Sequence, residues 1–155
     1  MAIEVTIEST IDAPADQVFE AVADLEAWPT WLIASGIRSV ARATDGPLAT
    51  GERLVVEQNA AGRAGTFEAE VSAVEPGRRL ALHGRDAEGV TIDIDAVIER
   101  PATQDAATTQ LRWTLRIGVP MRYRIFESMA RPQVERAALL DIEALRRMLE
   151  RPPED

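Results

Sequence analysis

The chain has 155 residues, of which 17 are basic and 26 acidic, so its formal charge is −9. This charge argues against a general nucleic-acid or anionic-membrane binder, because such binders need a net positive field. The absence of cysteine and the single histidine exclude disulfides, iron–sulfur clusters and a tetrahedral zinc site of Cys and His ligands. The length favours one globular domain, which we place at residues 1–150, followed by a frayed tail at 151–155.

The first elements are predicted to be a strand and two short helices. Residues 3–11 alternate apolar and polar side chains, as expected for a half-buried strand. Asp12-Ala13-Pro14 then offers an acidic cap and a proline suited to a first helical turn, so we expect a helix of about three turns. Pro29 leaves room for only a short second helix before Gly36.

From residue 37 to residue 119 the apolar residues recur at every second position, which is typical of strands with one buried face. We predict strands at about 37–43, 52–59, 65–74, 79–85, 90–99 and 108–118, which with the first strand makes seven. Turn sequences such as Glu75-Pro76-Gly77 and Glu88-Gly89 leave no room for crossover helices. Neighbouring strands are therefore expected to run antiparallel.

The C-terminal part of the chain, from Arg122 to Glu150, has the apolar spacing of one long helix. Pro132 either kinks this helix or marks its beginning. Its predicted apolar face contains Phe126, Met129, Ala130, Val134, Ala137, Ala138, Leu145, Met148 and Leu149. The fold class is thus α+β, with a curved antiparallel sheet wrapped around this helix, and one helix cannot fill such a sheet everywhere. We expect a hollow between them.

Four segments, in this order and at this spacing, resemble the START-like helix-grip superfamily, and most closely its polyketide cyclase/dehydrase branch. They are Ile11-Asp12-Ala13-Pro14-Ala15-Asp16-Gln17-Val18-Phe19, Trp28-Pro29-Thr30-Trp31, Val74-Glu75-Pro76-Gly77-Arg78-Arg79-Leu80 and the closing segment from Ile142 to Glu150. The resemblance covers essentially the whole chain. It implies a deep apolar pocket between the sheet and the C-terminal helix, with a ligand that varies between members and no single reaction.

The candidate ligand-binding residues share the predicted inward face of each strand or the apolar face of the helix. They are Trp31, Leu54, Val56, Gln58, Phe67, Ala69, Val71, Leu82, Ile94, Trp113, Leu115, Phe126, Met129, Ala130, Val134 and Asp141. By the same alternation, Ala73 is expected to point inward. Gln58, Ser9 or Asp141 would orient the ligand.

Other polar residues receive structural interpretations. Asp141 falls on the apolar helix face, where a structural hydrogen bond is the default and ligand anchoring the alternative. His83 could act as a general base, but its alternation with Leu82 places it on the outer face of the sheet. Asp93 and Asp95 are expected on that solvated face as well.

The predicted function is binding of a small hydrophobic or aromatic ligand, lipid-like or polyketide-like, by a carrier or sensor. Burial would provide most of the affinity, at about 0.8 kcal/mol for each ligand CH₂. Two alternatives stay open: a polyketide cyclase or aromatase, and a chaperone-activator-like module that binds a protein partner. We expect no cofactor, metal, nucleic-acid partner or membrane insertion, a cytoplasmic location, and a monomer or homodimer.

Overall fold

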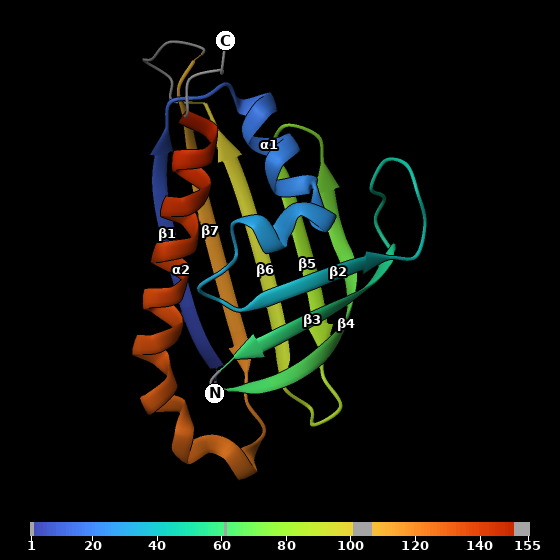
Figure 1. Ribbon diagram of the computed structural model, residues 1–155, viewed down its shortest axis with the longest axis vertical. Helices are drawn as coiled ribbons and strands as arrows, with labels where there is room; N and C mark the ends of the chain where they lie inside the picture. The colour runs from blue at the N-terminus through green and yellow to red at the C-terminus, as the bar shows by residue number, and fades with distance from the viewer. Residues whose placement is uncertain (1, 61, 101–106, 151–155) are drawn as a thin grey trace.

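Seven strands form one antiparallel sheet in the computed structural model, which describes residues 2–60, 62–100 and 107–150. The strands are β1 (Ala2–Ile11), β2 (Ile37–Arg42), β3 (Arg53–Ala60), β4 (Arg63–Glu75), β5 (Arg79–Arg85), β6 (Thr91–Glu99) and β7 (Thr109–Gly118). Their order in the sheet is β1-β7-β6-β5-β4-β3-β2, so β1 pairs with the last strand (Figure 1). The predicted frayed tail at 151–155 lies outside the described residues.

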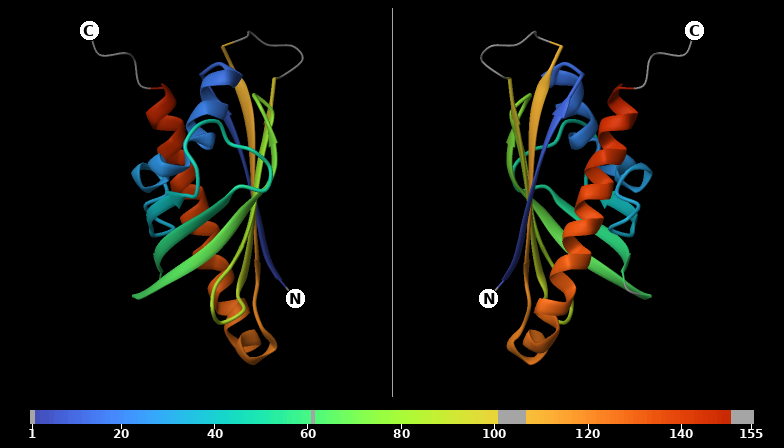
Figure 2. Two further views of the ribbon diagram at one scale, coloured as in Figure 1. Left: turned by 90° about the vertical axis from the view of Figure 1, so that its right-hand side faces the viewer. Right: turned by 90° about the vertical axis from the view of Figure 1, so that its left-hand side faces the viewer.

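The helical segments of the described residues all lie on one side of the sheet, and none of them covers the other face (Figure 2). They are α1 (Ala15–Ala23), the 3₁₀ helices η1 (Leu25–Thr30) and η2 (Met121–Phe126), and the long helix α2 (Glu127–Glu150). The helix α2 runs along β1, while α1 packs on β5 and β6. This arrangement confirms the predicted helix-grip fold.

Proline positions differ in detail from the prediction. Pro14 is the residue before α1, and no side chain caps that helix. Asp12 therefore does not act as the predicted cap; its backbone N–H instead donates to the Glu150 carboxylate at 2.9 Å, which ties the start of the α1 segment to the end of α2. Pro132 lies inside α2, which begins five residues earlier at Glu127.

A β-bulge in β4 overturns one inward assignment. Val71 pairs with Leu82, but the register then shifts, so that Ala73 pairs with Ala81 and Val74 with Leu80. Because Leu80 and Leu82 face the core, Ala73 lies on the outer face with Ala81, and Val74 packs against the core instead. Strict alternation fails here because a bulge inserts one unpaired residue.

The sheet curls at one edge, where β2, β3 and the start of β4 swing toward the side that carries α2 (Figure 2). Buried side chains fill the space between the C-terminal half of α2, β1 and α1.

Within the described ranges, no helix is long and apolar enough to cross a membrane. The same residues contain no group of three or more His, Cys, Asp or Glu placed to hold a metal ion.

Candidate functional site: a cavity beside the N-terminal half of α2

A cavity of about 390 Å³ lies between the sheet, the N-terminal half of α2 and the segment that follows η1. The sheet contributes apolar side chains from β4, β6 and β7, and the other two elements close the space. The cavity is lined by Leu32, Ala34, Ser35, Ile37, Gln58, Asn59, Phe67, Val90, Ile92, Ile94, Trp113, Leu115, Ile117, Ala130, Gln133, Val134 and Ala137. The lining is thus mainly apolar, with a few uncharged polar groups, which is the usual chemistry of a small-molecule site.

A larger hollow of about 700 Å³ lies between α1 and the turn that joins β4 to β5. Its walls are formed largely by exposed charged residues, which include Asp16, Glu75, Arg78, Glu99 and Arg100. Such a surface is well solvated and offers little apolar area to a ligand. We therefore take the smaller, apolar cavity as the candidate site.

Seven of the sixteen predicted binding residues line the cavity together: Gln58, Phe67, Ile94, Trp113, Leu115, Ala130 and Val134. Another six are core or near-core residues that do not reach it: Trp31, Leu54, Val56, Ala69, Val71 and Leu82. The alternation of a strand identifies its inward face, but it does not show which inward residues meet other side chains and which meet open space. A binding role for the lining residues stays a prediction.

Phe126 and Met129 do not lie where the helical pattern places them. Phe126 is 59% exposed and Met129 is 70% exposed, and neither lines the cavity. Two structural reasons explain this. Phe126 ends the 3₁₀ helix η2, whose turn differs from that of an α-helix. Met129 belongs to the first turn of α2, whose side toward the sheet is taken by Glu127 and Ala130, so that Met129 itself stays exposed.

Three tryptophans form a cluster at the inner end of the cavity. The ring centroids of Trp31 and Trp113 are 5.5 Å apart, those of Trp28 and Trp113 are 5.9 Å apart, and both pairs are edge-to-face. Only Trp113 lines the cavity. Trp28 and Trp31 pack against it, each 1% exposed, so the cluster acts as a rigid floor for the site.

Asp141 anchors the segment that closes the cavity. Its side chain is 1% exposed, and its two carboxylate oxygens accept the backbone N–H groups of Ala34 and Ser35 at 2.8 and 3.0 Å. Burial raises the pKa of the Asp141 carboxyl above its ordinary value, and these hydrogen bonds offset only part of that shift. The structural role expected by default is therefore present, and Asp141 does not line the cavity itself.

The same segment approaches β3 closely at Gly36. Gly36 has a φ of +76°, and a Cβ added there would lie 1.9 Å from the backbone oxygen of Asn59. The backbone N–H of Asn59 donates to Gly36 O at 2.8 Å, and Gln58 Nε2 donates to Ser35 O at 2.7 Å. Asp141 and Gln58 therefore hold the segment from both sides. Sequence reasoning predicted Gln58 but missed Ala34, Ser35 and Asn59, although the glycine before β2 was a usable signal.

The outer face of the sheet carries the remaining titratable candidates. His83 Nδ1 lies 2.6 Å from Asp93 Oδ1, and His83 is half exposed. Arg79 donates two hydrogen bonds to Asp95, both at 2.9 Å. Neither carboxylate nor His83 lines the cavity. Their location agrees with the predicted solvated face.

The comparisons with known proteins agree with this geometry. The family model described as "Polyketide cyclase / dehydrase and lipid transport" matches residues 2–150. No curated protein matches the chain in sequence.

Several solved structures share the fold. The Zhui aromatase/cyclase from Streptomyces sp. R1128 aligns with a TM-score of 0.77 and 21% identity over 97% of this chain and 95% of its own. A START superfamily protein from Mycobacterium smegmatis aligns with a TM-score of 0.72 and 19% identity over 95% and 97% of the two chains. Ginseng major latex-like protein 151 from Panax ginseng aligns with a TM-score of 0.67 and 10% identity over 97% and 99%. At these identities the structures show a common fold, and the family match shows that this chain belongs to the polyketide cyclase/dehydrase and lipid transport family.

Proposed function

We propose that this protein binds a small hydrophobic or aromatic molecule in the cavity between the sheet and α2, as a carrier or sensor. The observation that carries the proposal is the cavity of about 390 Å³, with its mainly apolar lining and rigid Trp113 floor. Burial of the ligand against these walls provides the affinity. The family description, which names lipid transport beside cyclisation, supports the same class of ligand.

The residues that line the cavity favour ligand binding over catalysis. General acid–base catalysis needs a titratable side chain within hydrogen-bond reach of the substrate. Among the described residues, none that lines the cavity is titratable. This supports a carrier or sensor over the cyclase that the fold also accommodates.

The proposal is tested with an uncharged fluorescent probe, N-phenyl-1-naphthylamine, which brightens when it leaves water for an apolar site. We expect saturable binding by the wild-type protein. Ala137→Phe, which places a ring inside the cavity, is expected to weaken probe binding at least about tenfold. Ala41→Phe is the matched control, because Ala41 is exposed on β2, away from the lining.

A thermal melt of each variant separates a filled cavity from an unfolded protein, and Ala130→Phe gives a second filled cavity if Ala137→Phe does not fold. Equal probe binding by the wild type, the filled variants and the control would contradict the proposal. Native mass spectrometry of freshly purified protein adds an independent reading, because a carrier is expected to retain a small molecule of the size of the cavity.

A further inference from the structure

The polar groups of the cavity gather on one wall. Ser35, Gln58 and Asn59 come from the segment after η1 and the end of β3, and Gln133 comes from α2. All four side chains are uncharged. The sheet walls opposite, from β6 and β7, present only apolar and aromatic side chains. The side-chain oxygens that line this space, which are its hydrogen-bond acceptors, therefore come from residues opposite β6 and β7.

The described residues that line the cavity include no cationic side chain, so none of them neutralises an anionic ligand. The carboxyl of Asp141 lies behind the polar wall, where it is bonded to Ala34 and Ser35. An anionic ligand would lose its hydration without gaining a counter-ion and would approach an acidic group. Burial of an unpaired charge is among the most costly events in a protein interior.

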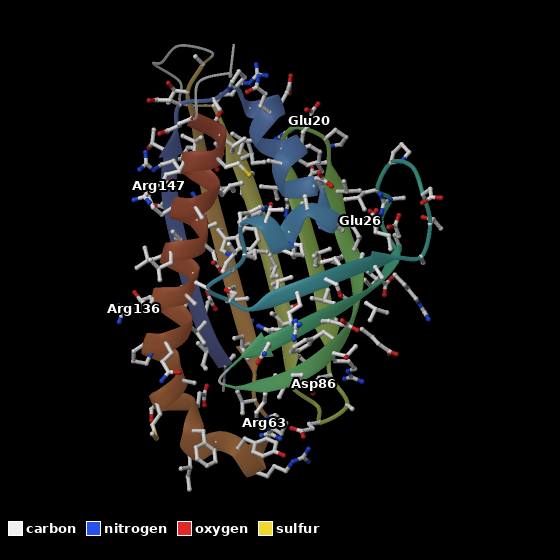
Figure 3. All side chains as sticks on the ribbon, viewed as in Figure 1. Glu20, Glu26, Arg63, Asp86, Arg136 and Arg147 are labelled. Atoms are coloured by element: carbon white, nitrogen blue, oxygen red, sulfur yellow. The ribbon has the colours of Figure 1, made fainter. Side chains whose placement is uncertain are left out.

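The surrounding arginines do not change this balance. Arg38 and Arg63 border solvent-facing hollows beyond Gln58, where they are accompanied by Glu57, Asp86 and Glu88. Arg63 and Asp86 both lie at the lower end of the molecule in Figure 3, by β4 and the turn between β5 and β6.

On the helix side, Arg131 extends to the backbone oxygens of Ala2 and Glu4 on β1, at 3.4 Å each. Arg136 projects away from the sheet (Figure 3). The positive charges of α2 near the cavity are therefore directed elsewhere.

The orientation of one amide defines what the polar wall offers. Gln58 Nε2 donates to Ser35 O at 2.7 Å, and Asp141 in turn accepts the N–H group of Ser35. Gln58 Nε2 carries two N–H groups, of which one is committed to Ser35 O, and Oε1 is the hydrogen-bond acceptor of this amide. A ligand group that pairs with Oε1 has to be a donor.

We propose that the ligand is an uncharged, mostly apolar molecule that carries a hydroxyl group, and that this hydroxyl donates to Gln58 Oε1. This inference rests on the proposed function, since it concerns the same cavity. The apolar body lies against the β6–β7 wall and Trp113, while the hydroxyl meets the polar wall. The site rejects carboxylates of the same shape.

Four naphthalene probes test the inference by calorimetry at pH 7. Naphthalene has no polar group, 2-methoxynaphthalene has an acceptor only, 2-naphthol has a donor, and 2-naphthoate is an anion. We expect 2-naphthol to bind about fivefold more tightly than 2-methoxynaphthalene, as for one neutral hydrogen bond. We expect 2-naphthoate to bind at least about 100-fold more weakly than 2-naphthol.

Two variants assign the donor preference to its residue. Gln58→Met removes the acceptor in a side chain of similar length and also removes the donor to Ser35 O, so all probes are expected to bind somewhat more weakly. The readout is the ratio of the affinities of 2-naphthol and 2-methoxynaphthalene, which is expected to lose its preference for 2-naphthol. Gln133→Met, on the α2 side of the lining, is expected to keep the preference. Naphthalene binding, measured in both variants, reports any common change in the cavity that is separate from the preference.

The failures of the two proposals are distinguishable. Binding of all four probes with similar affinity, or a preference that survives Gln58→Met, would overturn this inference and leave the proposed function standing. Absence of binding for every probe, together with failure of the fluorescent probe, would overturn both.

Discussion

The two halves of α2 face the same sheet in different ways. In the C-terminal half, Ile142 and Leu145 are each at most 1% exposed and pack into the core. In the N-terminal half, Ala130 and Val134 are only partly buried and face the cavity. The comparison teaches that one helix serves stability at one end and leaves room at the other, so the two properties can be altered separately.

The largest expected effect tests this separation directly. Leu145→Ala removes a fully buried side chain from a packed region and is expected to lower the free energy of unfolding by about 2–5 kcal/mol. Val134→Ala, at the cavity wall, is expected to cost less than about 1 kcal/mol, because the deleted methyl groups already border open space. Urea unfolding measures both. Similar costs for the two variants would show that the N-terminal half is packed as tightly as the C-terminal half.

The next effect concerns Asp141, which lies beside the packed residues of α2 and anchors the segment that lines the cavity. Asp141→Asn keeps the shape but replaces one acceptor oxygen with an NH₂ group, which would face the N–H of Ala34 or Ser35. We expect a loss of about 1–3 kcal/mol in the free energy of unfolding at neutral pH. Because the anchored segment lines the cavity, probe binding is expected to weaken as well. A variant with wild-type stability and binding would show that the two hydrogen bonds do not hold the segment.

The pH dependence of stability is a second test of the role of Asp141. Burial raises the pKa of Asp141 in the folded protein, so the folded state keeps a proton that the unfolded state, with a pKa of about 3.9, has already released. The Asp141 contribution to stability is therefore complete below that pH and decreases as the pH rises through the folded value. Asp141→Asn lacks this decrease, so the stability difference between the wild type and the variant is expected to narrow with rising pH.

Glu52 provides the matched contrast. The hydrogen bonds from Arg42, at 2.7 and 2.9 Å, hold the pKa of Glu52 below its ordinary value. Its contribution to stability is present above the unfolded pKa of about 4.3 and is lost as the pH falls through the lowered folded value. The stability difference between the wild type and Glu52→Gln is therefore expected to widen with rising pH. A common slope for the Asp141 and Glu52 variants would contradict the assigned directions.

The smallest expected difference lies in the tryptophan floor. Trp28 Nε1 donates to Val22 O at 2.8 Å, whereas Trp31 Nε1 is buried without a hydrogen-bond partner among the described residues. Trp28→Phe is expected to be more destabilising than Trp31→Phe by about 1 kcal/mol, because it leaves the Val22 oxygen unpaired. Thermal unfolding of the two variants checks this order. A larger loss of stability in Trp31→Phe than in Trp28→Phe would contradict the hydrogen bond from Trp28 to Val22.

Most of the fold follows from local patterns. The alternation of apolar residues and the turn sequences predict all seven strands to within about two residues, because each signal is contained within a few neighbouring positions. The pairing of β1 with β7 has no such local signal, since it joins residues about a hundred positions apart. The bulge between Val71 and Ala73 is also invisible to a rule of strict alternation.

The candidate site was predictable in part for a similar reason. Phe67, Trp113 and Val134 lie on faces that periodicity identifies, and they line the cavity. Ser35 lies in an irregular segment, and its position depends on the distant partners Asp141 and Gln58. Met129 shows the opposite error, in which the pattern predicts burial and the side chain is exposed. An apolar residue at helical spacing is buried only where another element covers it.

An NMR titration of the ¹⁵N-labelled protein with 2-naphthol tests the central claim most directly, because it reports both halves of α2 at once. The account predicts amide shifts that cluster around Ser35, Phe67, Leu115 and Val134, with the amides of Ile142 and Leu145 unmoved. Shifts concentrated on the outer face around His83, or on the packed half of α2, would contradict it.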